Sequence, residues 1–235
     1  MYIIKYFIFM PNQLYVTLSL LFLINLYGFL YSIMITSRFF SSKYKIQKDR
    51  FIEFDTIKKR TPLILFNIVV LMILTSFGLI YFKNFFISDY TTLTIELVKL
   101  SVVLLVDDIF FYFLHRSMHE SKYLYKKIHK IHHRANTPIP IDYIYVHPFE
   151  WLSGFIGPFI GMIILGGVSF NTFCAYLIIR NIHELHIHSG LKTSLLLKFI
   201  PFYGINEHHD MHHFKRDGNY ASTFIFLDKI FKTKI

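Results

Sequence analysis

Apolar residues in the first part of the chain form long runs that predict membrane-spanning helices. Gln13–Ile35 contains 23 residues without a charged side chain, and Pro62–Phe82 is a second run with a proline at its first position. At a rise of ~1.5 Å per residue, either run is long enough to cross a hydrocarbon core of ~30 Å. Proline is tolerated in the first turn of a helix, so we expect the second helix to begin there.

A third apolar run, about Leu93–Leu114, has the length of a membrane span but carries charged side chains. Ionisable groups at membrane depth are costly and usually face each other or a functional site. Glu96 and Lys99 lie three residues apart, so we expect them to form an ion pair on one face of this helix. Asp107 and Asp108 lie about two turns before the first histidine cluster, which favours a role beside that cluster.

The segment between the first two runs is strongly basic. Residues 37–61 carry three acidic side chains against eight basic ones, which are Arg38, Lys43, Lys45, Lys48, Arg50, Lys58, Lys59 and Arg60. Short basic loops stay on the cytosolic side of a membrane. The loop 37–61 is therefore predicted to be cytosolic, with the N-terminus on the opposite side and the third span returning the chain to the cytosol.

A fourth apolar region, residues 151–179, is interrupted by glycine and proline. The interrupting residues are Gly154, Gly157, Pro158, Gly161, Gly166 and Gly167. The region is too long for one straight span and too short for two spans with a turn. It predicts a broken or re-entrant helical hairpin that enters and leaves on the same face of the membrane. All 13 histidines then lie on the cytosolic side.

These patterns predict an all-α integral membrane protein with about three transmembrane helices, the hairpin 151–179 and a cytosolic, histidine-rich helical cap. We expect two regions along the chain. Residues 1–106 form transmembrane anchor helices and include the basic cytosolic loop 37–61. Residues 107–235 contain the hairpin and all of the histidines.

The composition agrees with a membrane location. Hydrophobic residues make up 54% of the chain and charged residues 17%, with a mean hydropathy of +0.43, whereas about 25% of residues are charged in soluble domains. A single cysteine, Cys174, excludes intrachain disulfides and metal sites built on several thiolates. A net charge of +10 suggests nucleic acid as a partner in a soluble chain. Here the cations lie between apolar runs, so we expect contacts to lipid headgroups and no nucleic acid.

Histidine is the unusual residue of this chain, with 13 in 235 residues. Twelve of them fall in four clusters: His115-x3-His119, His129-x2-His132-His133, His183-x2-His186-x-His188 and His208-His209-x2-His212-His213. Residues three and four apart share one face of a helix, so we expect the first, second and last clusters each to present imidazoles to a common point. An isolated histidine is usually a hydrogen-bonded structural residue, which we expect of His186 and His208.

Together the clusters offer more imidazoles than one metal ion binds. The candidate ligands are His115, His119, His129, His132, His133, His188, His209, His212 and His213, with His147 and His183 as further candidates. A metal ion takes four to six ligands, so this pool predicts two ions. Imidazole binds iron, zinc and copper, so the ligand type alone leaves the metal open.

The signatures of several other enzyme classes are absent from the sequence. His119-Glu120 and His183-Glu184 begin like the zinc-protease motif H-E-x-x-H, but the fifth positions are Tyr123 and Ile187. No glutamate is followed three residues later by histidine, as it is in ferritin-like di-iron proteins. A nucleophile elbow, a Rossmann fingerprint and a P-loop are also missing. The candidate site is therefore rich in neutral imidazole.

The clusters and their surroundings resemble the membrane-bound fatty acid hydroxylase/sterol desaturase superfamily and, within it, the 4-methylsterol monooxygenases. Members carry H-x3-H, H-x2-HH and a final H-x2-HH box. The similarity covers about Asp107–Lys232 and is strongest at the C-terminal box. The matching segments are Asp108 with Tyr112 and His115-Arg116, Ile128–His133, Tyr145–Pro148 with Glu150, His188–Gly190, Glu207–His213, Gly218–Phe224 and Asp228. Phe111 and Phe226-Leu227 depart from the pattern of many relatives.

The resemblance implies a monooxygenase that uses O2 and two iron ions, with zinc as an alternative in isolated protein, to oxidise a C-4 methyl group of a sterol. It implies electrons from NAD(P)H through an external carrier such as cytochrome b5. It also implies an endoplasmic reticulum membrane with the histidine boxes on the cytosolic face, and a catalytic role for residues 107–235. Asp108 and Asp210 are expected to orient the ligand imidazoles.

Other activities of the superfamily use nearly the same boxes and stay open at this point. They are sterol desaturation, sterol side-chain hydroxylation and fatty acid hydroxylation. A non-catalytic membrane scaffold that binds metal is an alternative of a different class.

Overall fold

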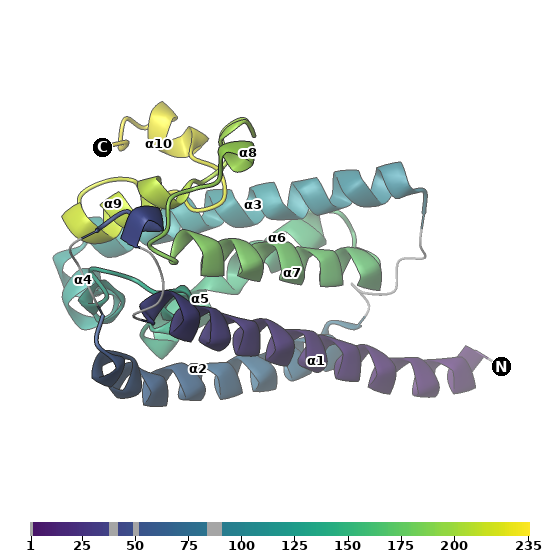
Figure 1. Ribbon diagram of the computed structural model, residues 1–235. Coiled ribbons are helices and arrows are strands. Elements are labelled where there is room, and N and C mark those ends of the chain that lie inside the picture. The colour runs from purple at the N-terminus through teal and green to yellow at the C-terminus, as the bar shows by residue number, and fades with distance from the viewer. Residues whose placement is uncertain (1, 38–41, 49–51, 84–90) are drawn as a thin grey trace.

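A computed structural model describes residues 2–37, 42–48, 52–83 and 91–235 of the protein, with side chains from Asn12 onward. Most of the described residues are helical, and the β-type pairings among them are isolated bridges, Lys45 with Leu191 and Tyr203 with Phe224. The predicted all-α fold is confirmed over this part of the chain. Figure 1 shows long helices lying side by side in a bundle, with short helices gathered at one end.

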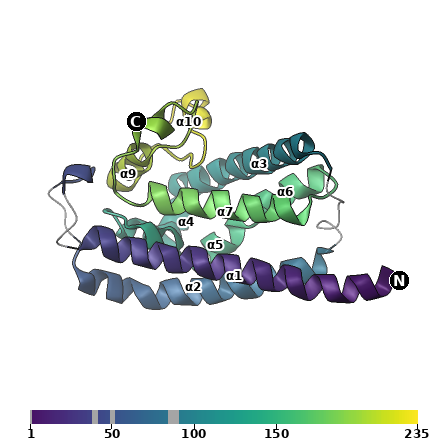
Figure 2. The same cartoon turned by 45° about the vertical axis from the view of Figure 1, so that its right-hand side comes forward.

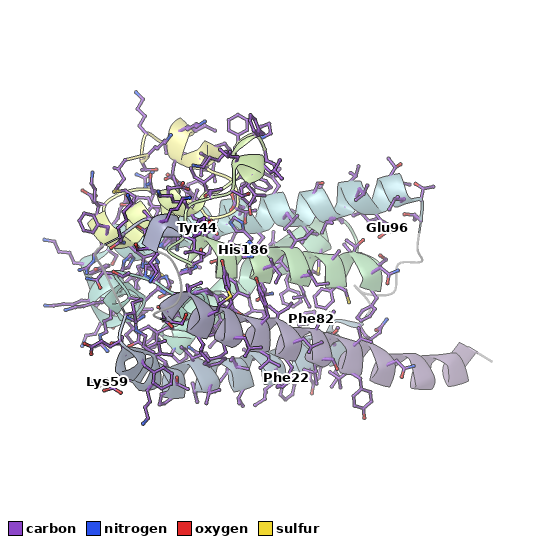
Figure 3. The ribbon with its side chains drawn as sticks, viewed as in Figure 1. Phe22, Tyr44, Lys59, Phe82, Glu96 and His186 are labelled. Atoms are coloured by element: carbon purple, nitrogen blue, oxygen red, sulfur yellow. The ribbon has the colours of Figure 1, made fainter. Side chains whose placement is uncertain are left out.

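The first two long helices pair along one side of the bundle. α1 spans Tyr2–Thr36 and α2 spans Phe54–Tyr81. Two segments, Asn12–Thr36 and Phe54–Tyr81, are long and apolar enough to cross a membrane, with hydropathies of 2.0 and 2.6. About a third or less of each is buried, at 33% and 28%, which leaves side chains such as Phe22 on the outside of the bundle (Figure 3). An apolar outer surface of this extent suits a lipid environment.

α2 begins at Phe54 and therefore earlier than the sequence pattern suggested. Pro62 lies inside the helix, not at its start. An interior proline removes one backbone hydrogen bond. The first turns form nevertheless, because Ile57 and Arg60 are buried against the rest of the protein.

α3 spans Leu93–Glu120, so the third apolar run continues without a break through the first histidine cluster and across the predicted division at residues 106 and 107. It is not one of the two candidate membrane spans, because it carries too many charged side chains. The carboxylate of Glu96 does not form the expected ion pair with Lys99. Glu96 accepts hydrogen bonds from the hydroxyls of Ser169 and Thr172, at the end of the bundle far from the histidines (Figure 3).

The apolar region 151–179 forms a broken helical hairpin, and its second arm is longer than expected. Its helices are α5 (Pro148–Gly154), α6 (Ile156–Ile164) and α7 (Phe170–Ile187). The turn before α7 contains Gly166 and Gly167 at φ values of 66° and 114°, which glycine adopts most readily. α7 continues past residue 179 because polar side chains such as Arg180 and Glu184 turn inward, where they bind one another.

α6 packs closely on α3 because glycines face that helix. A Cβ atom on Gly161 would lie 3.1 Å from the Cα of Val103. A Cβ atom on Gly157 would lie 2.5 Å from a carboxylate oxygen of Asp107. Two of the glycines that interrupt the apolar pattern in the sequence, Gly157 and Gly161, are thus contact positions between the hairpin and α3.

Short helices form a cap where α1 ends and α2 begins, as both views of the ribbon show (Figures 1 and 2). They are α4 (Lys122–Lys127), η3 (His129–Arg134), η4 (Pro140–Ile144), α8 (Leu195–Lys198), α9 (Asn206–Lys215) and α10 (Phe226–Ile230). Residues of α3, α7 and this cap carry the histidine clusters.

Part of the basic loop lies against the cap. The Ile46 amide donates to the Gly190 carbonyl at 2.9 Å, and the Lys192 amide donates to the Tyr44 carbonyl at 2.9 Å. The basic loop and the histidines therefore lie at the same end of the bundle, as expected of two segments on one side of a membrane. Residues 38–41 and 49–51 of the predicted loop, with Arg38 and Arg50, lie outside the described residues. The last part of the predicted loop, with Lys58–Arg60, forms the first turns of α2 instead.

Candidate metal centre

Nine histidines converge in two groups at the capped end of the bundle. The five-histidine group consists of His115, His119, His129, His133 and His212, and the four-histidine group consists of His132, His188, His209 and His213. Within each group, one ring nitrogen per residue lies within 4.8 Å of the others. These nine residues are the candidate ligands that the sequence put forward first, before His147 and His183.

Two pairs of consecutive histidines are divided between the two groups. In η3, His133 belongs to the five-histidine group and His132 to the four-histidine group; in α9, His212 and His213 are divided in the same way. The expectation that each cluster faces one common point is therefore wrong for the second and last clusters. Consecutive helical residues are rotated by ~100° about the helix axis, so their rings reach two neighbouring points. The ring centroids within each pair are 5.7 Å apart, which holds the two groups side by side.

The ring nitrogens within each group are spaced like ligands of one ion. The Nε2 atoms of His119 and His129 are 2.8 Å apart, those of His133 and His212 are 3.1 Å apart, and that of His209 is 3.0 Å from its nearest partner in the four-histidine group. Two ligand nitrogens at right angles, with metal–nitrogen bonds of ~2.0–2.1 Å, are separated by ~3 Å. The observed spacing therefore fits one bound ion in each group.

Hydrogen bonds on the opposite ring nitrogens leave Nε2 free to bind metal. Nδ1 of His115 donates to the Tyr220 carbonyl at 2.7 Å, and Nδ1 of His212 donates to the Gly218 carbonyl at 2.8 Å. A carbonyl acceptor requires the proton on Nδ1, so the lone pair is on Nε2. The donor set and these tautomers fit bound metal ions.

Burial keeps the imidazoles in the neutral form that metals bind. It lowers the pKa of His129 and of His132 to about 3. Burial, followed by the neighbouring imidazoles, also lowers the pKa of His209 and His213 well below the usual range. Protons therefore compete weakly with a metal ion for these nitrogens near neutral pH.

Glu150 orients a candidate ligand, a role that the sequence did not reveal. Its Oε1 atom accepts a hydrogen bond from Nδ1 of His129 at 2.9 Å. A carboxylate in this position fixes the ring and raises the basicity of the other nitrogen. Glu150 stands in one of the segments that resemble the superfamily, but its separation from His129 along the chain gives no local pattern that predicts the contact.

The two carboxylates expected in that role bind other groups. Asp108 accepts hydrogen bonds from the amides of Thr223 and Phe224 at 2.7 and 3.2 Å. Asp210 accepts hydrogen bonds from the side-chain amide of Gln47 at 2.9 and 3.0 Å. In these contacts Asp108 holds the C-terminal loop on α3, and Asp210 holds the basic loop on α9.

His147 and His183, the two further candidate ligands, lie outside both groups. Nδ1 of His147 accepts the Phe149 amide at 3.1 Å and caps α5. Nδ1 of His183 is 2.9 Å from the Tyr203 hydroxyl, and its Nε2 is 3.1 Å from the Ser222 carbonyl. Both rings thus have structural partners, and the geometry favours a set of nine ligands.

A pocket leads from the bundle interior to the histidines. It encloses about 1190 Å³ of unfilled space, including its mouth. Five of the nine histidines line it, and they are His115, His129, His132, His188 and His209. Apolar side chains of α1, α2, α6 and α7 line much of the rest. The pocket therefore joins a largely apolar lining to the two groups of histidines.

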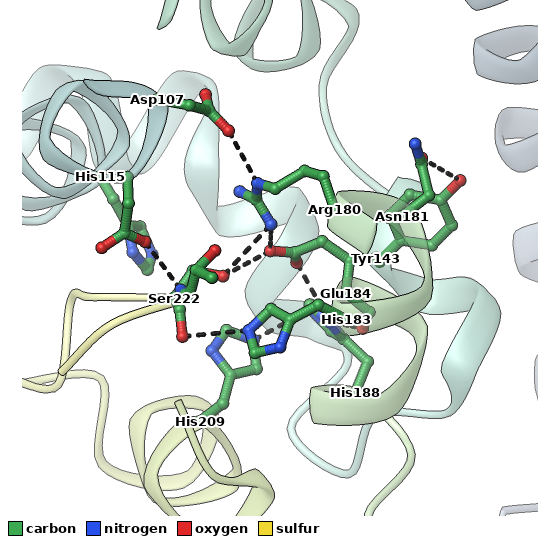
Figure 4. A network of polar contacts seen from close by, with 12 residues as sticks. Asp107, His115, Tyr143, Arg180, Asn181, His183, Glu184, His188, His209 and Ser222 are labelled. Atoms are coloured by element: carbon green, nitrogen blue, oxygen red, sulfur yellow. Dashed lines mark hydrogen bonds and ion pairs between the residues drawn. The ribbon is translucent and has the colours of Figure 1, made fainter. Parts of the chain in front are cut away.

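Charged side chains stand beside the histidines in this pocket (Figure 4). Nε of Arg180 donates to Asp107 at 2.9 Å, and Nη1 donates to Glu184 and, at 3.4 Å, to the hydroxyl of Ser222. Arg180 thus forms ion pairs with both Asp107 and Glu184. The pocket therefore holds two carboxylates and one guanidinium at its histidine end.

Asp228→Asn is expected to destabilise the loop that orients His115. The two oxygens of Asp228 accept the amides of Tyr220 and Ala221, both at 2.9 Å. An asparagine has only one acceptor oxygen, so we expect a loss of about 1–3 kcal/mol in the free energy of unfolding. Chemical unfolding of the purified protein at pH 7 measures this loss.

The contribution of Asp228 to the free energy of unfolding is expected to depend on pH. Burial opposes ionisation of Asp228, but the hydrogen-bond donors around it lower its pKa below the usual range. The stability that the carboxylate contributes is therefore present above its unfolded pKa of ~3.9 and is lost as the pH falls through the lower folded value. Asp217→Asn, at an exposed position, is the control. Equal losses for the two variants at pH 7 would contradict the role given to Asp228.

The helical bundle, its apolar outer surface and the two histidine groups are the features of a membrane protein with a candidate metal centre built from histidine. Comparison with known proteins identifies the family. Residues 100–233 match the family model described as fatty acid hydroxylase. The chain is 36% identical over 223 residues to "Methylsterol monooxygenase 1" of Rattus norvegicus, covering 92% of this chain and 74% of that protein.

Two further relatives show the range of similar proteins. "Methylsterol monooxygenase 1" of Danio rerio is 33% identical over 207 residues, which cover 83% of this chain and 68% of that protein. "Very-long-chain aldehyde decarbonylase GL1-8" of Oryza sativa subsp. indica is 33% identical over 213 residues, which cover 82% of this chain and 74% of that protein. No solved structure matches the chain.

The chain belongs to the fatty acid hydroxylase family. The resemblance drawn from the histidine boxes is thereby confirmed. Membership in this family, together with the similarity to monooxygenases over most of the chain, makes the protein an oxygen-dependent oxidoreductase.

Proposed function

We propose that this chain is a membrane-bound di-iron monooxygenase that oxidises a C-4 methyl group of a sterol with O2 and electrons from outside the chain. The observation that carries the proposal is the pair of imidazole groups at the end of an apolar pocket. Two relatives named for methylsterol oxidation, at 36% and 33% identity, support the substrate class.

The nine histidines of the two groups would hold the two ions through Nε2. Bound iron supplies the activation of O2 and the oxidising power that an unactivated C–H bond requires. Iron is proposed over zinc because zinc has no redox chemistry. The chain itself orients the ligands through acceptors such as the Tyr220 carbonyl and Glu150, and its apolar pocket excludes water from the reacting carbon.

The electrons are proposed to come from NAD(P)H through an external carrier such as cytochrome b5, because the sequence has no nucleotide-binding or haem motif of its own. The cap offers a basic surface for an acidic carrier. The exposed cations of α4 and η3 form this surface, and they are Lys122, Lys126, Lys127, Lys130 and Arg134. These side chains belong to α4 and η3, and η3 carries three of the proposed ligands.

The proposed membrane is that of the endoplasmic reticulum, with the histidine cap on the cytosolic face. The position of the basic loop beside the cap supports this orientation, since basic loops stay in the cytosol. We also propose that α3 is the third span and that the hairpin of α5, α6 and α7 enters the bilayer. The division of the chain into an anchor region, residues 1–106, and a catalytic region, residues 107–235, is part of the same proposal.

A different lipid substrate is the second candidate, and the similarity to an aldehyde decarbonylase favours it. A long-chain aldehyde or a fatty acyl lipid would use the same imidazole groups and the same apolar pocket. A metal-binding scaffold without activity is the remaining alternative.

Sterol profiling tests the proposal. In cells that lack their own 4-methylsterol oxidase, expression of this chain is expected to deplete the accumulated 4-methylsterols, because the apolar pocket brings them to the metal centre. The matched control is His132→Ala, which removes a ligand of the four-histidine group. Sterol analysis by mass spectrometry measures the result, with long-chain aldehydes and ceramides followed in the same extracts.

The outcomes separate the candidates. Persistent 4-methylsterols alongside a stably inserted wild-type protein would reject the sterol assignment. Conversion of another lipid in those cells would instead support the second candidate. Equal depletion by wild type and by His132→Ala would reject the ligand assignment.

A further inference from the structure

The pocket beside the metal centre is polar at one end and apolar at the other. α7 lines it from Phe173 to His188, a distance of ~22 Å at ~1.5 Å per residue. At the end away from the histidines the lining side chains are mainly apolar, and they include Leu71, Leu79, Phe159, Met162 and Phe173. The charged side chains near the histidines are Asp107, Glu150, Arg180 and Glu184. An elongated lipid in this pocket would therefore place its polar group beside the metal centre.

Arg180 is the cation of that polar end, and its position is fixed from several sides (Figure 4). Nε and Nη1 are occupied by the contacts to Asp107, Glu184 and Ser222 described above. The guanidinium carbon lies 5.2 Å from the centre of the Phe111 ring. A planar guanidinium held in this way presents its remaining nitrogen in one direction.

The remaining nitrogen, Nη2, is available to a ligand. No described residue accepts a hydrogen bond from it, and it is not one of the fully buried atoms that lack a partner. The Arg180 side chain keeps 13% of its surface exposed, and the residue lines the pocket. Nη2 is thus an accessible donor on a guanidinium whose Nε and Nη1 already have partners.

The charges around Nη2 select a neutral acceptor. Arg180 already pairs with Asp107 and Glu184, so the positive charge of this guanidinium is balanced within the site. A carboxylate or phosphate of a ligand would find no unpaired cation at Nη2 and would lie close to two acidic side chains, which is costly in a pocket with little water. A hydroxyl or carbonyl oxygen accepts the same hydrogen bond without that cost.

The polar end adjoins the four-histidine group directly. Oε2 of Glu184 lies 3.6 Å from Nδ1 of His188, and Arg180 precedes Glu184 by one helical turn. A ligand oxygen on Nη2 would therefore lie about one helical turn from the side chain that contacts His188.

We propose that Nη2 of Arg180 donates a hydrogen bond to a neutral oxygen of the substrate, on a carbon next to the one that is oxidised. This inference rests on the proposed function and sharpens it, because the hydroxyl of a 4-methylsterol is on C-3, beside C-4. Arg180 is then a specificity-determining residue that accepts neutral polar lipids and rejects lipids with an anionic group at that position.

Binding of matched ligands to the full-length, iron-loaded protein without O2 tests the inference separately from turnover. The ligands are 4-methylcholestan-3-ol, the ketone 4-methylcholestan-3-one, which keeps only the acceptor, and 4-methylcholestane, which lacks the oxygen. Each competes against labelled 4-methylcholestan-3-ol. We expect the alcohol and the ketone to bind within ~3-fold of each other and the hydrocarbon to bind ~10–100-fold more weakly, as for loss of a hydrogen bond to a charged donor.

Two matched variants assign the effect to Arg180. Arg180→Lys keeps the charge between the two carboxylates but loses Nη2, so the preference for alcohol over hydrocarbon is expected to fall to ~3-fold or less. Arg116→Lys is the control, because Arg116 forms the same i,i+4 pair with a glutamate, Glu120, at an exposed position on α3. This control is expected to keep the full preference.

The possible results distinguish the inference from the function on which it rests. Equal binding of alcohol and hydrocarbon by wild-type protein, or loss of ketone binding alone, overturns the inference while sterol oxidation still stands. Should no sterol bind or react, the proposed function fails, and 1-octadecanol, octadecane and octadecanoate then test the inference. Tighter binding of 1-octadecanol than of octadecane and octadecanoate supports the inference. Any other order of the three affinities overturns it. If Arg180→Lys does not fold, the affinities of the wild-type protein for the alcohol, the ketone and the hydrocarbon decide whether the inference stands.

Discussion

Replacing His212 with alanine is expected to lower turnover of a 4-methylsterol by more than ~100-fold and to lower the bound metal from two ions per chain to one or none. His212 is fully buried, and its Nε2 lies 3.1 Å from Nε2 of His133. Loss of this ligand opens the five-histidine group, whereas loss of a residue that only orients a ligand typically costs 10–100-fold. Turnover in membranes and metal analysis of the purified protein measure the two effects.

His186→Ala is the matched control for this prediction. His186 lies two residues before a proposed ligand, but it belongs to neither group, and its Nε2 is 3.4 Å from the hydroxyl of Tyr27. We expect this variant to retain both ions and most of the activity. Full activity in His212→Ala, or equal loss in both variants, would contradict the assignment of the two groups.

Replacing Arg60 with methionine is expected to destabilise the protein by about 3–5 kcal/mol. Arg60, in α2, pairs with Asp142 in η4, and the side chain of Asp142 is fully buried. Without Arg60 the carboxylate is left buried and uncompensated, which accounts for the size of the loss. Thermal unfolding in detergent measures it.

Two further variants test the reason for this loss. Arg60→Met combined with Asp142→Leu removes both charges, and we expect it to recover much of the stability. Arg116→Met breaks an exposed pair with Glu120 and is expected to cost ~1 kcal/mol or less. A small effect of Arg60→Met, or no recovery in the double variant, would show that the buried pair does not fix α2 to η4.

The parts of the fold that consist of long apolar helices could be predicted from the sequence. Two spans and the hairpin follow from apolar length, because the cost of unpaired backbone in lipid leaves helix as the outcome. The residues at which the helices begin and end were harder to predict from the sequence. α2 includes Pro62, and α7 passes residue 179, because tertiary contacts of Arg60 and Arg180 stabilise turns that the local pattern marks as breaks.

The ligands of the candidate metal centre could be predicted from the sequence. Their division into a five-histidine group and a four-histidine group could not. Spacing of three and four residues identified the histidines, but the assignment of His132 and His133 to different groups depends on where α3, α7 and α9 meet. The carboxylate beside His129 was missed for a similar reason. Glu150 reaches it through the packing of α5 against η3, a contact that no sequence pattern encodes.

Iron analysis combined with X-ray absorption spectroscopy of the purified, active protein tests the central claim most directly. The account predicts two irons per chain with a first coordination shell dominated by imidazole nitrogen and an iron–iron scattering feature. One metal per chain, a shell dominated by carboxylate oxygen, or zinc alone in active protein would contradict a centre built from the two histidine groups.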